Sequence, residues 1–269
     1  MTHSRLRAGL SATAFAAAVA AGPAAAQMAA AAASYHGAPD RVIDFKVDWG
    51  PVSLAEVQFR ISDAGEDLRL ELEGRSVGMA RLVADFRSEQ TITYAADGRR
   101  RYHVVSDFGD DGSLRSVEWN DPAAPPVVEV SASTQDGDVT PIPAAELLNT
   151  VDPAYPVLAA LAQIEAGGAC EGAWRTFDGE RRLNVMLEDL GDDVLEADRD
   201  WTYGGPARKC RLRFQRVGGF ELVSDAPVQA EEDEYERLLW IAQLPDGAAP
   251  VKMRVSWPLG YATGRIDLR

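Results

Sequence analysis

Apolar and polar residues alternate along most of this chain. The first run places Ile43, Phe45, Val47 and Trp49 at every second position. This period of two indicates strands with one buried face. Turn-like pairs, such as Asp97-Gly98, separate many of the runs, and such turns are typical of hairpins. The strands predicted in this way span residues 43–49, 57–61, 68–72, 91–94, 102–106, 114–119, 127–130, 174–177, 183–187, 195–203, 210–214, 235–244, 251–257 and 261–268.

Two segments have helical spacing instead. Within residues 78–87, apolar residues recur at i, i+3, i+4 and i+7, which predicts a short amphipathic helix. The second helix is expected to begin with Asp152 as its N-cap and Pro153 in the first helical position, and to end at Gly167-Gly168. Its apolar face consists of Val157, Leu158, Leu161 and Ile164.

These elements predict a mainly β protein. Ten or more strands with one or two short helices are typical of a single antiparallel rolled sheet, in the form of a barrel, half-barrel or sandwich. The proline-rich stretch 120–145 could be a linker between two domains. We favour a connection within one domain, residues 41–269, because the preceding strands need partners for their edges.

Residues 1–26 have the pattern of a secretory signal peptide. Arg5 and Arg7 precede an alanine-rich stretch that ends in small residues, so we expect cleavage after Ala26. A membrane anchor is disfavoured because this stretch lacks about twenty strongly apolar residues. The mature protein would then be periplasmic, without a membrane anchor, and would begin with a flexible leader at residues 27–40.

The charge balance excludes one class of partner. The chain has 27 Lys and Arg against 42 Asp and Glu, a net charge of −15. Loss of residues 1–26 would remove two arginines and bring the net charge to −17. Nucleic-acid binding requires a basic surface, so DNA and RNA are poor candidate partners.

Cys170 and Cys210 are the only cysteines. In an oxidising compartment such a pair most often forms a disulfide bond. Redox catalysis usually requires Cys-x-x-Cys spacing, and a metal site would need additional Cys or His ligands. We therefore predict a structural disulfide.

Several longer runs resemble a known family. They are DFKVDWGPVSLAEVQFRI, DPAYPVLAAL, GACEGAWRTFDGERRLNV, ARKCRLRFQRVGGF and APVKMRVSWPLGYATGRIDL. Over residues 35–269 the chain resembles the exported bacterial family catalogued as domain of unknown function 3108. The resemblance implies a single-domain periplasmic protein with an antiparallel, barrel-like sheet, and it transfers no catalytic residue. A similarity of architecture to half-barrel lipoprotein carriers is fold analogy only.

The sequence contains no complete catalytic signature. Gly74-Arg75-Ser76-Val77-Gly78 matches the short pattern Gly-x-Ser-x-Gly, but His-Glu-x-x-His is absent. Beyond residue 26 the only histidines are His36 and His103, so a serine triad or a zinc site would have to be built around His103. We therefore expect no enzymatic activity and no cofactor. A hydrolase that uses two carboxylates is a weaker alternative, because 42 acidic residues form many chance pairs.

One acidic stretch resembles a calcium-binding loop. Asp107, Asp111 and Glu118 match positions one, five and twelve of an EF-hand, with Gly109 at position three, where Asp or Asn is expected. The flanking segments have strand patterns. We favour an acidic hairpin over a metal site.

Tryptophans provide the candidate ligand contacts. In a rolled sheet they could line a cavity for a lipid or another apolar envelope component, or they could fill a solid core. The first reading predicts a non-enzymatic periplasmic binding protein. The alternative is a protein-interaction module for cell-envelope maintenance, which docks an envelope protein by strand addition or through its acidic surface. The candidate ligand-binding residues are Trp49, Trp119, Trp174, Trp240 and Trp257.

Overall fold

The computed structural model describes residues 40–63, 65, 67–82, 85–108, 111–121, 123–132, 138–220, 235–257 and 260–268. The predicted signal peptide and residues 27–39 of the predicted leader lie outside the described residues. The side chains of Phe108, Asp111, Ala132 and Trp257 are likewise not described.

The described residues form thirteen strands, one α-helix and two 3-10 turns. The helix is α2 (Tyr155–Glu165), and the turns are η1 (Gly78–Leu82) and η2 (Ala144–Glu146). The strands are β1 (Arg41–Trp49), β2 (Val52–Asp63), β3 (Leu68–Ser76), β4 (Arg87–Tyr94), β5 (Arg100–Phe108), β6 (Asp111–Trp119), β7 (Val127–Ala132), β8 (Gly172–Phe177), β9 (Arg182–Leu195), β10 (Gly205–Gly218), β11 (Arg237–Leu244), β12 (Gly247–Trp257) and β13 (Gly260–Asp267).

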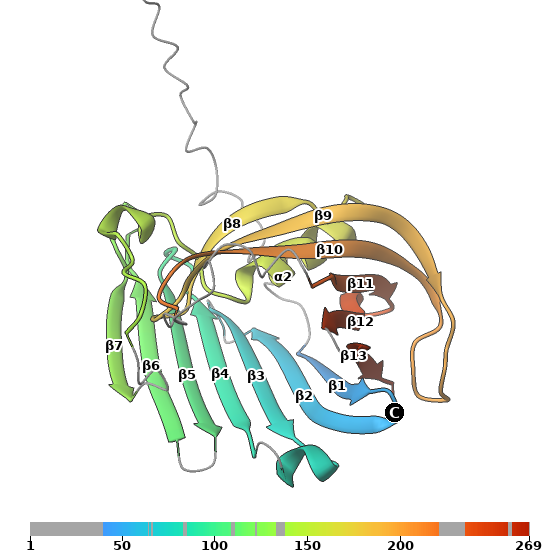
Figure 1. The fold of residues 1–269 in the computed structure, drawn as a ribbon. Coiled ribbons are helices and arrows are strands. Elements are labelled where there is room, and N and C mark those ends of the chain that lie inside the picture. Colours follow the sequence, from blue (N-terminus) through green and yellow to red (C-terminus); the bar gives the residue numbers. More distant parts are fainter. Residues whose placement is uncertain are drawn as a thin grey trace, which may run out of the picture.

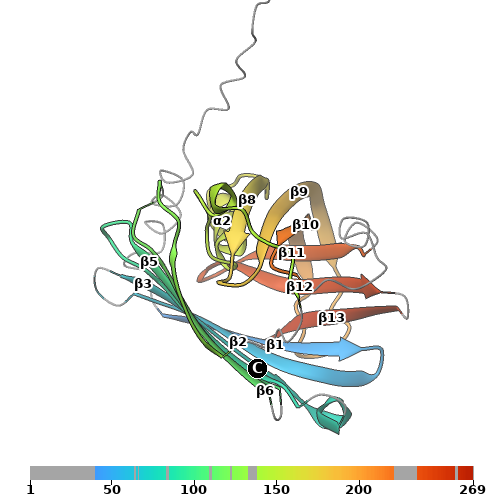
Figure 2. The same cartoon turned by 60° about the vertical axis from the view of Figure 1, so that its left-hand side comes forward.

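All thirteen strands belong to one antiparallel sheet that does not close. The order is β7-β6-β5-β4-β3-β2-β1-β13-β12-β11-β10-β9-β8. Two meanders, β1–β7 and β8–β13, are therefore joined where the first and last strands pair. Figure 1 shows β1–β7 as one curved wall with β8–β10 arching over it. Figure 2 shows β11–β13 rising above β1 and β2 on the same side of this wall. The predicted fold class, a rolled antiparallel sheet, is confirmed.

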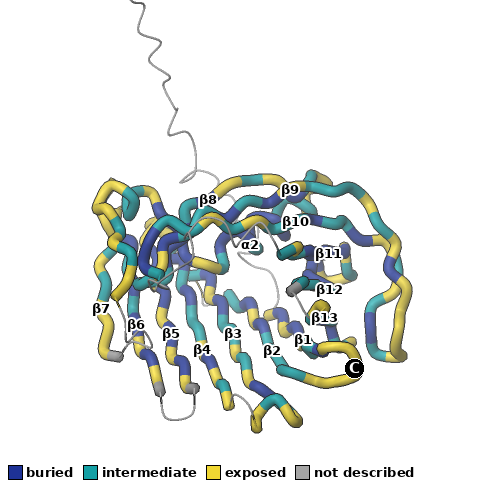
Figure 3. Tube along the Cα trace, in the orientation of Figure 1, coloured by how far each residue is buried: buried dark blue, intermediate teal, exposed yellow. Residues whose placement is uncertain are grey.

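The core lies between the inner face of β1–β6, helix α2 and strands β8–β12. Because strand side chains alternate between two faces, every second residue of these strands points into it. Ile43, Leu70, Ile92 and Val117 supply the sheet side, and Leu161 of α2, fully buried, belongs to the same core cluster. In Figure 3 dark blue segments recur along these strands, between teal and yellow ones.

Helix α2 begins two residues later than the sequence predicts. Its first helical residue is Tyr155 instead of Pro153, and Ala154 occupies the capping position. Asp152 nevertheless contributes to the start of the helix. Its Oδ1 accepts hydrogen bonds from the backbone N–H groups of Ala154 at 3.1 Å and Tyr155 at 3.0 Å.

In the segment predicted as an amphipathic helix at 78–87, the described residues form the 3-10 turn η1 and the start of β4. Its apolar residues Met79 and Leu82 are 72% and 84% exposed, so no apolar face is buried. The segment connects β3 with β4. Backbone hydrogen bonds from Ser76 N–H to Phe86 O and from Val77 N–H to Leu54 O hold its ends. Eight residues lie between these ends, and those that the structure describes contain a single 3-10 turn.

The two cysteines form the predicted disulfide bond. Cys170 follows α2 and Cys210 lies on β10, with their Cα atoms 6.1 Å apart. Both side chains are fully buried. The bond fastens the end of the helix to the sheet.

The long β9–β10 hairpin bends over the outer side of β11–β13 (Figure 1). The loop that connects β9 with β10 contacts β13. The Leu268 N–H donates to Trp201 O at 3.0 Å, and Arg265 pairs with Asp198 at 2.7 Å. Residues of both faces of β11, such as Leu239 and Trp240, are consequently buried.

Candidate functional site

A cavity of about 1070 Å³ is lined by residues of β1–β5, η1 and the end of β13. Nine of its nineteen lining residues fall into two rows that run across the strands. Opposite residues of paired strands share one face of a sheet, so each row projects from a single face. The first row is Asp267, Asp44, Gln58 and Glu73, and the second is Lys46, Glu56, Arg75, Arg87 and Asp107.

The floor between the two rows is backbone. Phe45, Val57, Gly74 and Ser88 also line the cavity, and each lies on its strand directly beside members of the rows. Alternation turns the side chains of Phe45, Val57 and Ser88 to the opposite, inner face of the sheet, and Gly74 has no side chain. Phe45, for example, packs against the core. The cavity is therefore a groove on the outer, polar face, which we call the charged groove.

Ion pairs neutralise part of the charged groove. Lys46 pairs with Asp267 at 2.8 Å and Arg75 with Glu56 at 2.7 Å. Beside η1, Arg81 pairs with Asp85 at 3.1 Å, and this hydrogen bond lowers the pKa of the Asp85 carboxyl.

Two carboxylates of the first row face the groove and form no ion pair with a basic side chain among the described residues. Asp44 accepts a hydrogen bond from Gln58 Nε2 at 2.8 Å, and Glu73 has no hydrogen bond or ion pair within the described part of the chain. Asp44 and Glu73 lie two strands apart, which corresponds to about 10 Å. Their charges are available to a ligand that spans the strands.

The candidate tryptophans do not gather around a cavity. Trp119, Trp174 and Trp240 are buried, and Trp49 lies partly exposed at the end of β1. None of these four lines the charged groove. The side chain of Trp257 lies outside the described residues.

The buried tryptophans have internal partners. Trp119 Nε1–H donates to Thr150 Oγ1 at 3.0 Å, and Trp240 Nε1–H donates to Asp193 Oδ2 at 2.8 Å. Trp174 packs edge-on against Tyr155, with the ring centroids 6.3 Å apart. These contacts are those of tryptophans that fill and anchor a core.

The calcium-loop residues lie along a β-hairpin. Asp107 pairs with Gly112 near the β5–β6 turn, whereas Glu118 pairs with Arg101 six residues further along the ladder. At about 3.4 Å per residue the two acids are about 20 Å apart, too far to share an ion. Glu118 instead accepts a hydrogen bond from Arg101 Nε at 2.8 Å. Asp107 and Glu118 therefore lie along a β-hairpin and not within one compact loop, which is the arrangement favoured from the sequence. No group of three Asp, Glu, His or Cys residues placed for one metal ion occurs among the described residues.

A buried polar cluster that the sequence reasoning missed joins α2 to β4 and β5. Asp152, fully buried, accepts hydrogen bonds from Tyr94 OH at 2.9 Å to either carboxylate oxygen, and Arg100 Nη1 lies 3.9 Å away. Burial raises the pKa of Asp152 and of Tyr94. The sequence did contain a signal, because the alternation of β5 places Arg100 on the same face as Tyr102, which points into the core.

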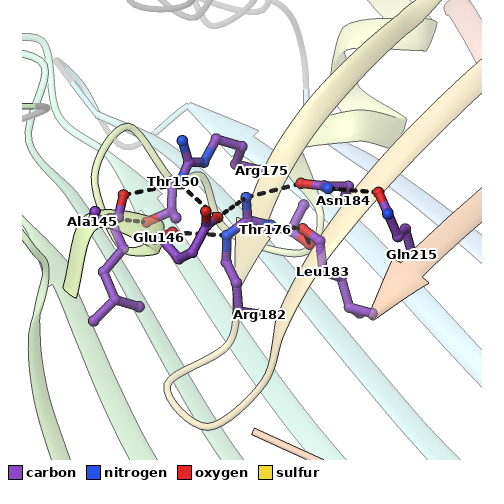
Figure 4. A network of polar contacts seen from close by, with 10 residues as sticks. Ala145, Glu146, Thr150, Arg175, Thr176, Arg182, Leu183, Asn184 and Gln215 are labelled. Atoms are coloured by element: carbon purple, nitrogen blue, oxygen red, sulfur yellow. Dashed lines mark hydrogen bonds and ion pairs between the residues drawn. The ribbon is translucent and has the colours of Figure 1, made fainter. Parts of the chain in front are cut away.

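A second polar network fastens the η2 segment to the β8–β9 hairpin (Figure 4). Arg182, almost fully buried, donates through Nε to Glu146 O at 2.8 Å and through Nη2 to Asn184 Oδ1 at 2.9 Å. Arg175 donates to Glu146 Oε2, also at 2.8 Å. Burial lowers the pKa of Arg182 to about 10. None of these residues lines the charged groove, and we assign them a structural role.

Comparisons with known proteins identify no family. No family model and no curated protein matches the chain. The sequence resemblance to domain of unknown function 3108 is therefore not supported. One similar solved structure is a DUF1329 family protein from Desulfovibrio piger, at 10% identity and a TM-score of 0.25, with 91% of this chain and 89% of that chain covered. None of the described helices is long and apolar enough to span a membrane.

Proposed function

We propose that this protein is a non-enzymatic binding protein of the cell envelope whose charged groove holds an extended, cationic segment of a partner. The observation that carries the proposal is the groove of about 1070 Å³ on the polar face of the sheet. Its volume is at the upper end of the range found for ligand sites. Export to the envelope is part of the proposal and rests on the signal-peptide pattern of residues 1–26.

The sign of the charge favours a cationic ligand. Six carboxylates and four basic side chains line the groove. The ion pairs within it leave Asp44 and Glu73 as the carboxylates of the first row without a cation. A concave surface with an excess of carboxylates concentrates positively charged partners, and the net charge of −15 acts in the same direction.

The apolar-ligand reading has less support. The inner face of the curved sheet, where a lipid would lie, packs against α2 and β8–β12. The described candidate tryptophans are buried in contacts of their own or lie at a strand end.

Calorimetric titration of the protein with the synthetic peptide Lys-Ala-Lys-Ala-Lys-Ala-Lys tests the proposal. The double variant Asp44→Asn/Glu73→Gln should weaken binding by about fivefold or more, because it removes both unpaired carboxylates of the first row. The matched control is Asp97→Asn/Asp192→Asn, which changes the net charge equally at exposed positions outside the groove.

The control variant should bind the peptide as the unmodified protein does. Equal weakening of both double variants would show attraction to net charge alone, and absence of binding to the unmodified protein would likewise reject the proposal.

A further inference from the structure

Strand β7 forms one edge of the sheet and has a partner on one side only. It pairs with β6 from Val127, opposite Glu118, to Ala132, opposite Leu114. No other described strand lies against its second side. The left-hand margin of the sheet in Figure 1 is this edge.

The opposite edge, β8, is covered by the chain itself. Val151 forms a parallel bridge with Thr176 of β8. Its N–H donates to Arg175 O at 2.7 Å, and Phe177 N–H donates to Val151 O at 2.9 Å. The fold therefore protects one edge with its own backbone and leaves the other free within the described residues.

β7 lacks the residues that usually prevent an edge strand from pairing with another chain. Edge strands are usually protected by lysine, proline or inward-pointing charges. β7 has none of these between its ends and carries one acid, Glu129. Val127 and Val130 are 55% and 45% exposed.

We infer that β7 accepts an extended segment of a partner protein as an additional antiparallel strand, the orientation of every other strand pair in the sheet. Main-chain hydrogen bonds would supply the pairing, and the two faces of β7 would select the sequence. This surface is separate from the charged groove and does not depend on it.

The two faces define the partner's chemistry. Val128 and Val130 lie opposite Val117 and Arg115 of β6, so they point to the core side. An added strand therefore places apolar residues on that side. Glu129 points to the other face, where a basic residue of the added strand would lie beside it. A second copy of β7 centred on Glu129 would bring two carboxylates together, and its like net charge would repel.

Hydrogen exchange with the synthetic peptide Lys-Val-Lys-Val-Lys-Val-Lys tests the inference. Binding should slow exchange of the amides at residues 127–132 by about tenfold or more, because strand addition satisfies edge N–H groups. Protection that appears elsewhere in the chain, with none at β7, would overturn the inference. The inference would also be overturned if β7 were protected without peptide and this protection increased with protein concentration. The added strand would then come from a second copy of the protein.

Two methylated peptides separate strand addition from charge attraction. One carries N-methyl groups on its valine amides and the other on its lysine amides. In an antiparallel added strand with valines on the core side, only one of these amide sets faces β7. One methylated peptide should therefore bind as the unmodified peptide does, and the other should lose binding. Equal binding of both would exclude strand addition.

The protein variant Glu129→Lys should weaken binding of the unmethylated peptide by about tenfold, because it places like charges side by side. Glu196→Lys is the matched control, since it makes the same change of charge at an exposed position directly after β9. It adds a lysine without changing the edge and should leave binding unchanged. Unchanged binding to Glu129→Lys would reject the assigned partner chemistry.

Discussion

At the scale of single residues, the polar groups inside the core determine how α2 attaches to the sheet. Asp152 is the centre of this attachment, because it accepts hydrogen bonds from Tyr94 and from the first turn of the helix. A buried carboxylate of this kind is costly to leave without its partners. Its protonation therefore links the stability of the protein to pH.

The stability difference between the protein and Asp152→Asn should depend on pH. Burial raises the folded-state pKa of Asp152 above the ordinary value of 3.8. The folded state then binds the proton more tightly, so stability contributed by Asp152 is present below pH 3.8 and is lost as pH rises through the folded pKa.

Asparagine does not titrate, so the variant lacks this loss. In urea unfolding from about pH 4 to 8, the free energy of unfolding of the variant should rise relative to that of the unmodified protein as pH rises. A stability difference that stays constant over this range would contradict the argument.

Gly219 is a second residue on which the fold depends. Its φ is +81°, and a Cβ at this position would lie 1.8 Å from Glu180 O, a backbone atom of the β8–β9 turn. Gly219→Ala should therefore destabilise the protein by about 3 kcal/mol or more, through strain and collision together.

Gly98→Ala is the matched control for Gly219→Ala. Gly98 has a similar φ of +86°, but a Cβ there would meet nothing within 4 Å. The cost should be about 1 kcal/mol, from the backbone conformation alone. Thermal unfolding of both variants measures the difference, and equal losses would show that the contact with Glu180 is unimportant.

At the scale of elements, alternation was sufficient to predict nearly every strand. β1 and β3, for instance, contain the predicted strands 43–49 and 68–72, whereas most of the predicted strand 195–203 lies in the connection between β9 and β10. Spacing failed at η1, because periodicity does not show whether a short segment meets a surface that can bury it. In α2 the same spacing meets β8, β9, β11 and β12, and Leu161 is buried there.

The charged groove could not have been predicted from the sequence. Its residues, such as Asp44 and Glu73, occupy ordinary outward positions of alternating strands. Only the register of β1, β2 and β3 aligns them in one row across the sheet. The sequence left two readings of the tryptophans open, because a residue's type does not say which side of a strand faces a cavity, and in the structure Trp119, Trp174 and Trp240 are buried.

The disulfide bond belongs to the scale of elements, since it ties the end of α2 to β10. Its cysteines are 40 residues apart, and closing a loop of this length stabilises a fold by about 4 kcal/mol in the chain-entropy model. Cys170→Ser, Cys210→Ser and the double variant should therefore lose similar stability.

Denaturant unfolding of the oxidised and of the reduced protein measures how much stability the disulfide bond contributes. The reduced protein should match the serine variants. A double variant much less stable than either single variant would mean that each cysteine contributes through packing as well as through the bond.

At the scale of the whole molecule, the pairing of β1 with β13 makes one sheet from two meanders. Six residue pairs, from Asp44 opposite Asp267 to Trp49 opposite Ala262, form this seam. Ile266 lies at the seam on the buried side and belongs to the same core cluster as Leu161 of α2. The core is thus continuous across the seam, and neither meander has an apolar interior separate from the other.

Unfolding should therefore be a single transition. Tryptophan fluorescence reports on both meanders, through Trp119 in the first and Trp174 and Trp240 in the second, and circular dichroism reports on all strands. The two signals should coincide. Ile266→Asp buries a charge at the seam and should cost about 4 kcal/mol, but the two signals should still coincide at a lower midpoint. Separate transitions in this variant would show that each meander is stable alone, and that the seam joins two independent units.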